Sequence, residues 1–288
     1  MLSRGLSRNA KFISSKQKIL LMGHPGTRKT SSLIELAVAY PDVNVFLIDP
    51  DDGVPKLVEV LFGGWANVPN LHYYPVSSWT KEPDDDYFLG VRQAYAEIQS
   101  LAKPGDWIGI DMAGKIWQYV RDWYDLKIYG ATENDMKIQR REDNGEEMFG
   151  GLSSNEWKEV KGELDQVLWH AVKRLPCNVV IASGVKQIPV KKDGSPLYPG
   201  TDERFLKLGV APDVEKRLPY EMDTIISLTA KDKIVDKKLH TEWSFRTIGK
   251  DRNGKVGPIA EGLINNGLWI DYAIAVGIDP TSSPGKEA

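Results

Sequence analysis

The sequence is poor in cysteine, in long apolar runs and in net charge. Cys177 is the one cysteine among 288 residues, which excludes an internal disulfide and a cysteine-based zinc cluster. A single cysteine is typical of a reducing, cytoplasm-like compartment. No apolar run approaches the roughly 20 residues that a membrane-spanning helix needs, and the first twelve residues lack the apolar stretch of a secretion signal. We therefore expect a cytoplasmic protein that is not integral to a membrane.

The net charge of −3 excludes a uniformly basic protein that coats nucleic acid, but the charge is unevenly distributed. Residues 1–30 hold seven Lys or Arg and no acid, and residues 184–255 hold 15 basic and 11 acidic residues. Between them, residues 31–183 hold 14 basic and 25 acidic residues. This pattern predicts a local positive surface that faces a polyanion. The alternative is solvated charge with no partner.

Short apolar segments typical of buried strands alternate along the chain with segments of helical periodicity. The expected strands are residues 18–22, 43–48, 71–76, 106–111, 177–183, 223–229 and 242–248. The expected helices are residues 30–40, 87–102, 115–129 and 155–175. Such alternation predicts an α/β fold with a doubly wound, mainly parallel sheet and helices on both faces. Two long polar stretches, 130–154 and 184–209, interrupt it and are predicted to be functional or disordered loops.

The most specific motif follows the first expected strand, where residues 23–30 have the sequence GHPGTRKT and lead into a helix. A phosphate-binding loop (P-loop) needs this order of strand, tight loop and helix N-terminus. Its backbone N–H groups would surround the β-phosphate, while Lys29 reaches the β- and γ-oxygens and Thr30 ligates Mg²⁺. ATP and Mg²⁺ are therefore the expected cofactors. The predicted nucleotide-binding residues are Gly23, His24, Pro25, Gly26, Thr27, Arg28, Lys29, Thr30 and Ser31.

The motif departs from its usual form at Arg28, where a glycine is expected before the lysine. That glycine allows the backbone to approach phosphate and to adopt dihedrals that a Cβ resists. Three interpretations remain open: the loop binds nucleotide with Arg28 turned outward, the loop is weakened or inactive as a catalyst, or Arg28 itself contacts phosphate.

Carboxylates follow two of the expected strands. Asp49, Asp51 and Asp52 stand at the carboxyl end of the second strand, the edge at which a doubly wound sheet binds ligands. We expect Asp51 to activate water as a general base, with Asp49 and Asp52 as competitors. The alternative is an Asp-rich turn or helix cap. Asp111 ends the strand WIGID and is the expected Mg²⁺-positioning acid opposite Thr30.

Three further groups are candidates near the phosphates. Ser183 ends another expected strand and would sense the γ-phosphate, with Lys186 or Gln187 relaying the change to the next loop; the alternative is a simple strand end. Lys250 and Arg252 flank Asp251 in the sequence TIGKDRNGK. Either cation would reach the γ-phosphate of a neighbouring subunit as a finger. The alternative is a charged β-turn.

The segments GHPGTRKT, LIDPDDG, WIGID, RLPYEMDTIISL and FRTIGKDRNGK, together with the long helix and strand at 153–183, resemble phage-encoded RecA-core nucleotide-binding proteins, relatives of the RecA and RadA recombinases. The resemblance covers roughly residues 18–255. It implies a RecA-type sheet of strand order 5-1-4-3-2, a homo-oligomer with ATP at the subunit interface, and single-stranded DNA as partner. It gives Asp51 the role of the water-activating acid, and Lys250 and Arg252 that of the trans-acting cations. It also implies DNA-contacting loops at 130–154 and 184–209.

The second of these loops combines cations with aromatic residues, the pattern that binds single strands by phosphate contact and base stacking. Tyr198 and Phe205 are interleaved, and Asp193 and Asp202 are among the acids that reduce the positive charge. Exposed loop charge without a partner is the alternative. The predicted DNA-binding residues are Lys186, Lys191, Lys192, Arg204 and Lys207. The aromatic residues of 115–129 are interpreted as packing rather than as a base-stacking platform.

The sequence thus predicts a basic N-terminal arm at 1–17, a P-loop ATPase core at 18–255 and a C-terminal extension at 256–288. The leading hypothesis is an ATP-binding and ATP-hydrolysing protein that acts on single-stranded DNA in recombination, repair or replication. The alternative is a non-hydrolysing, nucleotide-dependent DNA-binding or annealing module with a degenerate P-loop. A small-molecule phosphotransferase ranks last, because no cluster of lid arginines is found.

Overall fold

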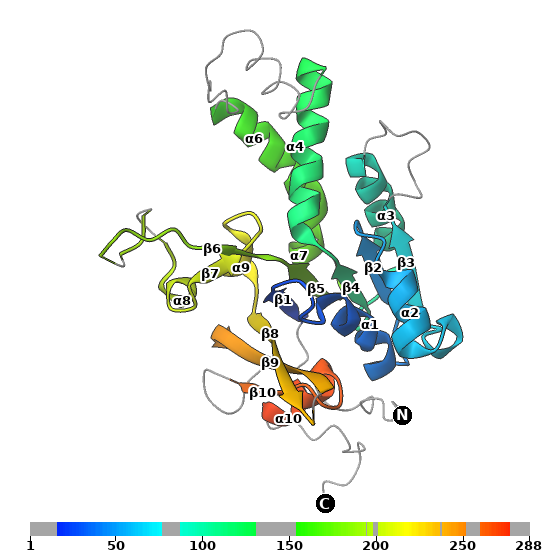
Figure 1. Ribbon diagram of the computed structural model, residues 1–288. Helices are drawn as coiled ribbons and strands as arrows, with labels where there is room; N and C mark the ends of the chain where they lie inside the picture. The colour runs from blue at the N-terminus through cyan, green and yellow to red at the C-terminus, as the bar shows by residue number, and fades with distance from the viewer. Residues whose placement is uncertain are drawn as a thin grey trace, which may run out of the picture.

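A computed structural model describes residues 16–76, 87–130, 154–193, 195–197, 201–236, 238–251 and 260–276 (Figure 1). The strands are β1 (Lys18–Gly23), β2 (Val45–Asp49), β3 (Leu71–Pro75), β4 (Trp107–Ile110), β5 (Asn178–Ser183), β6 (Val185–Gln187), β7 (Val210–Pro212), β8 (Thr224–Val235), β9 (Lys238–Asp251) and β10 (Glu261–Leu263). The longer helices are α1 (Lys29–Ala39), α2 (Val54–Phe62), α3 (Tyr87–Leu101), α4 (Ala113–Tyr129), α6 (Ser154–Leu164) and α10 (Leu268–Ala275). The short ones are η1 (Trp65–Asn67), η3 (Asp165–Trp169), α7 (His170–Lys173), α8 (Glu203–Leu206) and α9 (Leu218–Glu221). None of these described helices has the length and apolarity needed to cross a membrane.

Within the described residues, eight strands form one mixed sheet of order β10-β9-β8-β1-β5-β4-β2-β3. The strands from β8 to β3 are parallel, and β9 and β10 add antiparallel to one edge. The predicted α/β class with a mainly parallel sheet is confirmed. The central strands β8-β1-β5-β4-β2, numbered in chain order, follow the predicted 5-1-4-3-2, but the sheet as a whole is larger, because β3 is added beyond β2 and the β9–β10 pair beyond β8. β6 and β7 form a separate two-stranded sheet.

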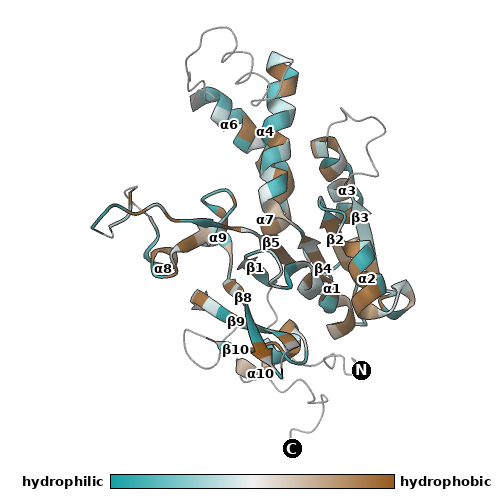
Figure 2. Cartoon of the chain, viewed as in Figure 1, coloured by the Kyte–Doolittle hydropathy of each residue, from teal (hydrophilic) through white to brown (hydrophobic). Residues whose placement is uncertain are grey.

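Helices cover both faces of the sheet, and alternate side chains of β1 are buried against one face and then the other. Leu20 and Met22 join a cluster that includes α3, α4 and α6, whereas Ile19 and Leu21 join a cluster that includes α1, α2 and α10. Successive strand residues point to opposite faces, so a strand with helices on both sides must be apolar throughout. The colouring of the central strands as mainly hydrophobic shows this (Figure 2).

Residues 260–276 continue the same fold beyond the position at which the sequence placed the end of the core. β10 pairs with β9, and Trp269 and Tyr272 of α10 are almost completely buried against the α1 face. The Trp269 indole Nε1 donates to the Ser32 carbonyl at 2.6 Å. The described part of the predicted C-terminal extension, residues 260–276, is therefore packed into the core.

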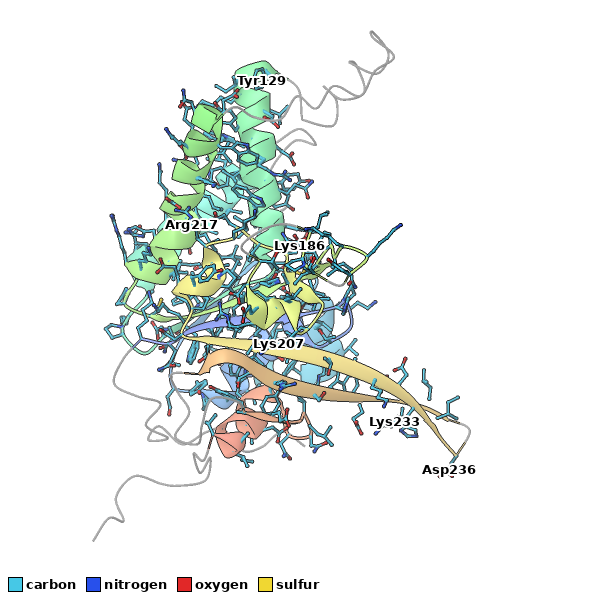
Figure 3. The ribbon with its side chains drawn as sticks, turned by 90° about the vertical axis from the view of Figure 1, so that its left-hand side faces the viewer. Tyr129, Lys186, Lys207, Arg217, Lys233 and Asp236 are labelled. Carbon is cyan, nitrogen blue, oxygen red and sulfur yellow. The ribbon has the colours of Figure 1, made fainter. Side chains whose placement is uncertain are left out.

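β8 and β9 are much longer than the predicted strands 223–229 and 242–248. They remain paired in register up to Val235 and Lys238, and their far end runs away from the body of the molecule (Figure 3). Ile234 and Leu239 face each other there and are 78% and 69% exposed. We refer to residues 229–235 and 238–244 as the projecting hairpin. The predicted strands ended early because the projecting residues are largely polar and carry no burial signal.

The predicted helix at 155–175 is present, interrupted by the π-helical turn η3 between α6 and α7. Figure 1 shows α4 and α6 rising together above the sheet. Trp117 and Trp157 stack between them with ring centroids 5.7 Å apart, and Trp117, Tyr119 and Trp123 pack against the buried core. This favours the packing interpretation of the aromatic helix.

Candidate nucleotide-binding site

The loop between β1 and α1 is a tight turn built from its own backbone. Gly26 adopts a positive φ of 80°, and the Thr27 hydroxyl donates to the His24 carbonyl at 2.8 Å. At Gly23 a Cβ would lie 2.4 Å from Thr27 Oγ1 and 2.7 Å from the Leu228 carbonyl, so a larger residue has no room. His24, Pro25 and Gly26 are exposed at the turn. The two glycines are thus required by conformation and by close contact.

Lys29 opens α1 with its ammonium folded against the loop. Only 7% of the residue is exposed, and Nζ donates to the carbonyls of Gly23 and His24, both at 2.8 Å. Burial lowers the pKa of this ammonium, and the carboxylates of Asp111 and Asp51 act in the opposite direction. The cation is therefore held inside the loop and close to two acids.

Thr30 and Asp111 meet across the carboxyl edge of the sheet. The Thr30 hydroxyl donates to Asp111 Oδ2, while Oδ1 of the same carboxylate is buried and without a hydrogen-bond partner among the described residues. Burial raises the pKa of Asp111 to about 6, and the Thr30 hydrogen bond opposes that shift. A threonine oxygen next to an unsatisfied carboxylate oxygen fits the hard-oxygen preference of Mg²⁺. The neighbouring Ser31 is buried in the first turn of α1.

The described residues hold no group of three or more His, Cys, Asp or Glu that would bind a metal by itself.

The three acids after β2 have different surroundings. Asp49 is completely buried and accepts hydrogen bonds from the backbone N–H groups of Asp51 and Val54, both at 3.0 Å. It therefore shapes the turn into α2, the capping role weighed as the alternative for this group. Asp51 forms an ion pair with Lys115 of α4, and its charge contributes to the pKa shifts of Lys29 and Asp111. Asp52 adopts a left-handed φ of 53°.

Arg28 adopts the left-handed conformation for which glycine is the usual residue, with φ 69° and ψ 21°. For a non-glycine residue this costs about 1–2 kcal/mol. Its guanidinium Nη2 lies 3.0 Å from Glu35 Oε1, and Cζ lies 5.0 Å from the centre of the Trp243 ring. The arginine is thus engaged with Glu35 and Trp243, which favours the interpretation in which Arg28 is turned away from the phosphates.

The other candidates for contact with the phosphates lie on β5, on β6 and at the end of β9. Ser183 is buried at the end of β5 opposite Met22 of β1, and its hydroxyl donates to the Gly184 carbonyl at 2.7 Å. Lys186 and Gln187 follow on the short strand β6 and are exposed. Lys250 is part of β9, and Arg252 lies outside the described residues.

The five predicted DNA-binding residues do not form one equivalent set. Lys191, Lys192 and Lys207 are exposed, and Lys186 lies 3.4 Å from Asp213. Figure 3 shows Lys186 and Lys207 on the same part of the molecule. Arg204 binds the Asp202 carboxylate through Nε and Nη2 and lies over the rings of Phe205 and Tyr220. The loop at 130–154 lies outside the described residues except at its two ends.

Three residues that the sequence did not single out belong to this neighbourhood: Glu35, Lys115 and Trp243. Glu35 carried a signal, because it is an acid on the apolar helix that follows the loop. Trp243 carried none, since it is 217 residues away from Gly26, whose carbonyl accepts a hydrogen bond from its indole. A cavity of about 560 Å³ lies elsewhere, lined by Arg92, His170 and Arg217 among others, and none of the predicted nucleotide-binding residues lines it.

Comparison with known proteins gives only distant structural likenesses. No family model matches the chain, and no curated protein matches it. Among solved structures, a RadB recombinase aligns over 86% of this chain and 88% of its own, with 14% identity and a TM-score of 0.43. A DnaB-like replicative helicase aligns over 86% and 56%, with 13% identity and a TM-score of 0.38. Likenesses this distant do not indicate what this chain binds.

Proposed function

We propose that the protein is a RecA-like P-loop ATPase that binds ATP and Mg²⁺ at residues 23–31. The observation that carries the proposal is the contact between Thr30 and Asp111, which stand 81 residues apart. It joins the helix that follows the loop to the acid that follows β4, and it leaves one buried carboxylate oxygen without a hydrogen-bond partner among the described residues. A buried carboxylate oxygen without a partner is costly at the end of an apolar strand. A hydrated Mg²⁺ would satisfy it.

Each residue has a chemical task in this proposal. The chemistry supplied by bound Mg²⁺ is the neutralisation of charge on the β- and γ-phosphates. Thr30 and Asp111 would hold that ion, and Lys29 would exchange its carbonyl contacts for phosphate oxygens. Asp51, oriented by Lys115, would accept the proton of the attacking water. The loop amides would bind the β-phosphate.

We further propose single-stranded DNA as the partner, with a role in phage-type recombination, repair or replication in the cytoplasm of the host. The exposed lysines at 186, 191, 192 and 207 support it, because cations spaced along a loop follow a phosphate backbone. Arg204 would contribute less, since Asp202 already binds its guanidinium.

The second candidate is a non-hydrolysing, nucleotide-dependent DNA-binding or annealing module. Two observations favour it over a fully active ATPase. The glycine position of the loop is occupied by Arg28 in a left-handed conformation, and the carboxylate of the candidate base Asp51 is already engaged in an ion pair with Lys115.

ATP turnover with and without single-stranded DNA distinguishes the two. The variants are Lys29→Ala and, as a matched control, Lys56→Ala on the exposed side of α2. DNA-stimulated turnover that is lost in Lys29→Ala and kept in Lys56→Ala supports the ATPase. Nucleotide-dependent DNA binding at low salt with no turnover supports the second candidate. Absence of both nucleotide and DNA binding contradicts both.

We also propose a homo-oligomer in which Lys250 and Arg252 reach the nucleotide of a neighbouring subunit. Mixing two inactive variants, Lys29→Ala and Arg252→Ala, tests this. A site shared between subunits regains part of its turnover on mixing, because some interfaces then combine an intact loop with an intact cation. No regain on mixing, with both variants assembled, contradicts a shared site.

A further inference from the structure

Arg28 is held from two sides by groups that lie outside the phosphate-binding loop. On one side is Glu35, two turns further along α1 and only 6% exposed. Its Oε1 takes the guanidinium at 3.0 Å. On the other side is Trp243 of β9, whose ring lies 5.0 Å from the guanidinium carbon. A cation between a buried carboxylate and an aromatic face has little freedom to turn elsewhere.

Glu35 is fixed by a C-terminal helix, whereas Trp243 belongs to a C-terminal strand and is bound to the loop itself. The second oxygen of Glu35 accepts a hydrogen bond from the Leu268 backbone N–H at the start of α10, at 2.8 Å. Trp243 donates its indole N–H to the Gly26 carbonyl in the loop at 3.1 Å. It stands where the projecting hairpin leaves the sheet, paired with Ala230 of β8. Arg28, Glu35, Trp243 and Gly26 thus form one connected unit, which we call the loop clamp.

We propose that Glu35 and Trp243 are positioning residues for the nucleotide loop, which they keep competent for phosphate by holding Arg28 outside it. The inference rests on the proposed nucleotide-binding function. An arginine side chain that lay across the loop amides would occupy the place where they bind phosphate, so this loop needs the guanidinium held elsewhere. Glu35 and Trp243 supply that restraint, and they make the loop dependent on β9 and α10.

Holding Arg28 and supporting only the packing of α1 and α10 are two roles of Glu35 that predict different effects of its replacement. If Glu35 serves only α1 and α10, its replacement by glutamine weakens nucleotide binding equally whether residue 28 is arginine or glycine. If it holds Arg28, the replacement is harmful only while the arginine is there to be released. The two roles therefore differ in their coupling, which a double-mutant cycle measures.

The experiment measures the affinity for ADP, by calorimetry, of the full chain and of Glu35→Gln, Arg28→Gly and the double variant. With Arg28 present, we expect Glu35→Gln to weaken ADP binding about tenfold or more, which corresponds to about 1.4 kcal/mol; a loss of less than about threefold there overturns the inference. We expect a change of less than about threefold in the Arg28→Gly background. Equal losses in both backgrounds overturn the inference.

A matched cycle on Arg246 and Glu261 is the control. This pair joins β9 to β10 at 3.5 Å, and both side chains are largely exposed, so its variants Arg246→Ala and Glu261→Gln should leave ADP affinity unchanged. Trp243→Phe adds a separate readout, since it keeps an aromatic face for the guanidinium and removes the hydrogen bond to Gly26. We expect a loss smaller than that of Trp243→Ala.

A second measurement separates this inference from the proposed function. Amide hydrogen exchange of residues 24–30 reports on the loop without any nucleotide. Glu35→Gln should speed exchange there in the Arg28 background and not in Arg28→Gly. A wild-type chain that binds no nucleotide overturns the proposed function. Unchanged exchange in Glu35→Gln overturns the clamp, whether or not nucleotide binds.

Discussion

At the scale of single residues, Asp111 is a buried carboxyl at the proposed magnesium site. The residue is 1% exposed, and burial raises the pKa of its carboxyl to about 6 from 3.8. A carboxyl whose folded pKa is raised makes the folded state bind more protons than the unfolded state between these two values. The free energy of unfolding therefore falls as pH rises from about 4 to 6, and stays lower above that range.

We predict that Asp111→Asn stabilises the protein at pH 7.5 by about 1–3 kcal/mol, since the amide removes the buried charge and still accepts the Thr30 hydroxyl. The gain should shrink towards zero near pH 4, where the wild-type carboxyl is protonated. Denaturant unfolding at the two pH values measures it. A gain that is the same at both pH values would contradict the assigned origin.

The same variant should lose Mg²⁺-dependent nucleotide binding. Asparagine has no negative charge for the cation, so we expect the affinity for Mg²⁺·ADP to fall to that for ADP with a chelator present. Calorimetry with and without Mg²⁺ checks this. Retained Mg²⁺ dependence would show that another group holds the ion.

The sequence predicted that Lys29, Thr30 and Asp111 lie together, because a phosphate-binding loop requires these residue types at these places relative to strands and a helix, and the structure brings them to one edge of the sheet. The sequence did not predict the partners of Arg28. Trp243 is brought to Arg28 by tertiary packing across 215 residues, and no local pattern encodes such a contact. Glu35 lies seven residues along the same helix, where the sequence showed an acid on an apolar helix but not its contact with Arg28. For Asp49, the sequence showed an acid at a strand end, but only the fold distinguishes a turn-shaping acid from a base.

At the scale of elements, the strand-to-loop junction at Gly23 is the place least tolerant of a larger side chain. A Cβ there would meet Thr27 Oγ1 and the Leu228 carbonyl of β8 well inside contact distance. We predict that Gly23→Ala lowers the free energy of unfolding by about 1–3 kcal/mol through overpacking. It should also abolish nucleotide binding, because the loop must shift to admit the methyl group.

Gly162 supplies the control for that variant. It lies on the exposed side of α6 with no atom within 4 Å of the place of a Cβ. Gly162→Ala should stabilise the protein by about 0.5–1 kcal/mol through helix propensity, with nucleotide affinity unchanged. Thermal unfolding of both variants gives the comparison, and a neutral Gly23→Ala would contradict the crowded geometry.

Most central elements follow from the sequence, and the peripheral ones do not. The apolar runs of β1, β2, β4 and β5 are signals that burial on both faces produces. By contrast, α10 is short and almost wholly apolar, so it shows no helical period, and β10 has only three residues. The sequence analysis did not predict α2, although its Val54, Val58 and Phe62 form a buried stripe at helical spacing. The Asp-rich residues 49–52 that precede it were interpreted as part of a turn.

At the scale of the whole molecule, the C-terminal segment 260–276 is part of the core. A chain that ends at residue 259 loses Trp269 and Tyr272, which are 2% and 0% exposed, and uncovers the face of α1. Since burying each such side chain is worth about 3–5 kcal/mol, we expect the unfolding midpoint to fall by at least about 10 °C. A chain that ends at Val276 keeps every described contact and is the control. An unchanged midpoint at 259 would contradict this role of α10.

The projecting hairpin has a geometric consequence for anything that approaches this edge of the molecule. At roughly 3.4 Å per residue, the segment from Thr229 to Val235 extends about 20 Å. A partner with a flat face that approached along the hairpin would meet its exposed end at Asp236 first, with Ile234 and Leu239 just behind it (Figure 3), and would be kept at that distance from the sheet edge. A partner surface can reach the sheet edge in this direction only if it has a recess about as deep as the hairpin is long. The shape of the hairpin therefore restricts which surfaces can bind there.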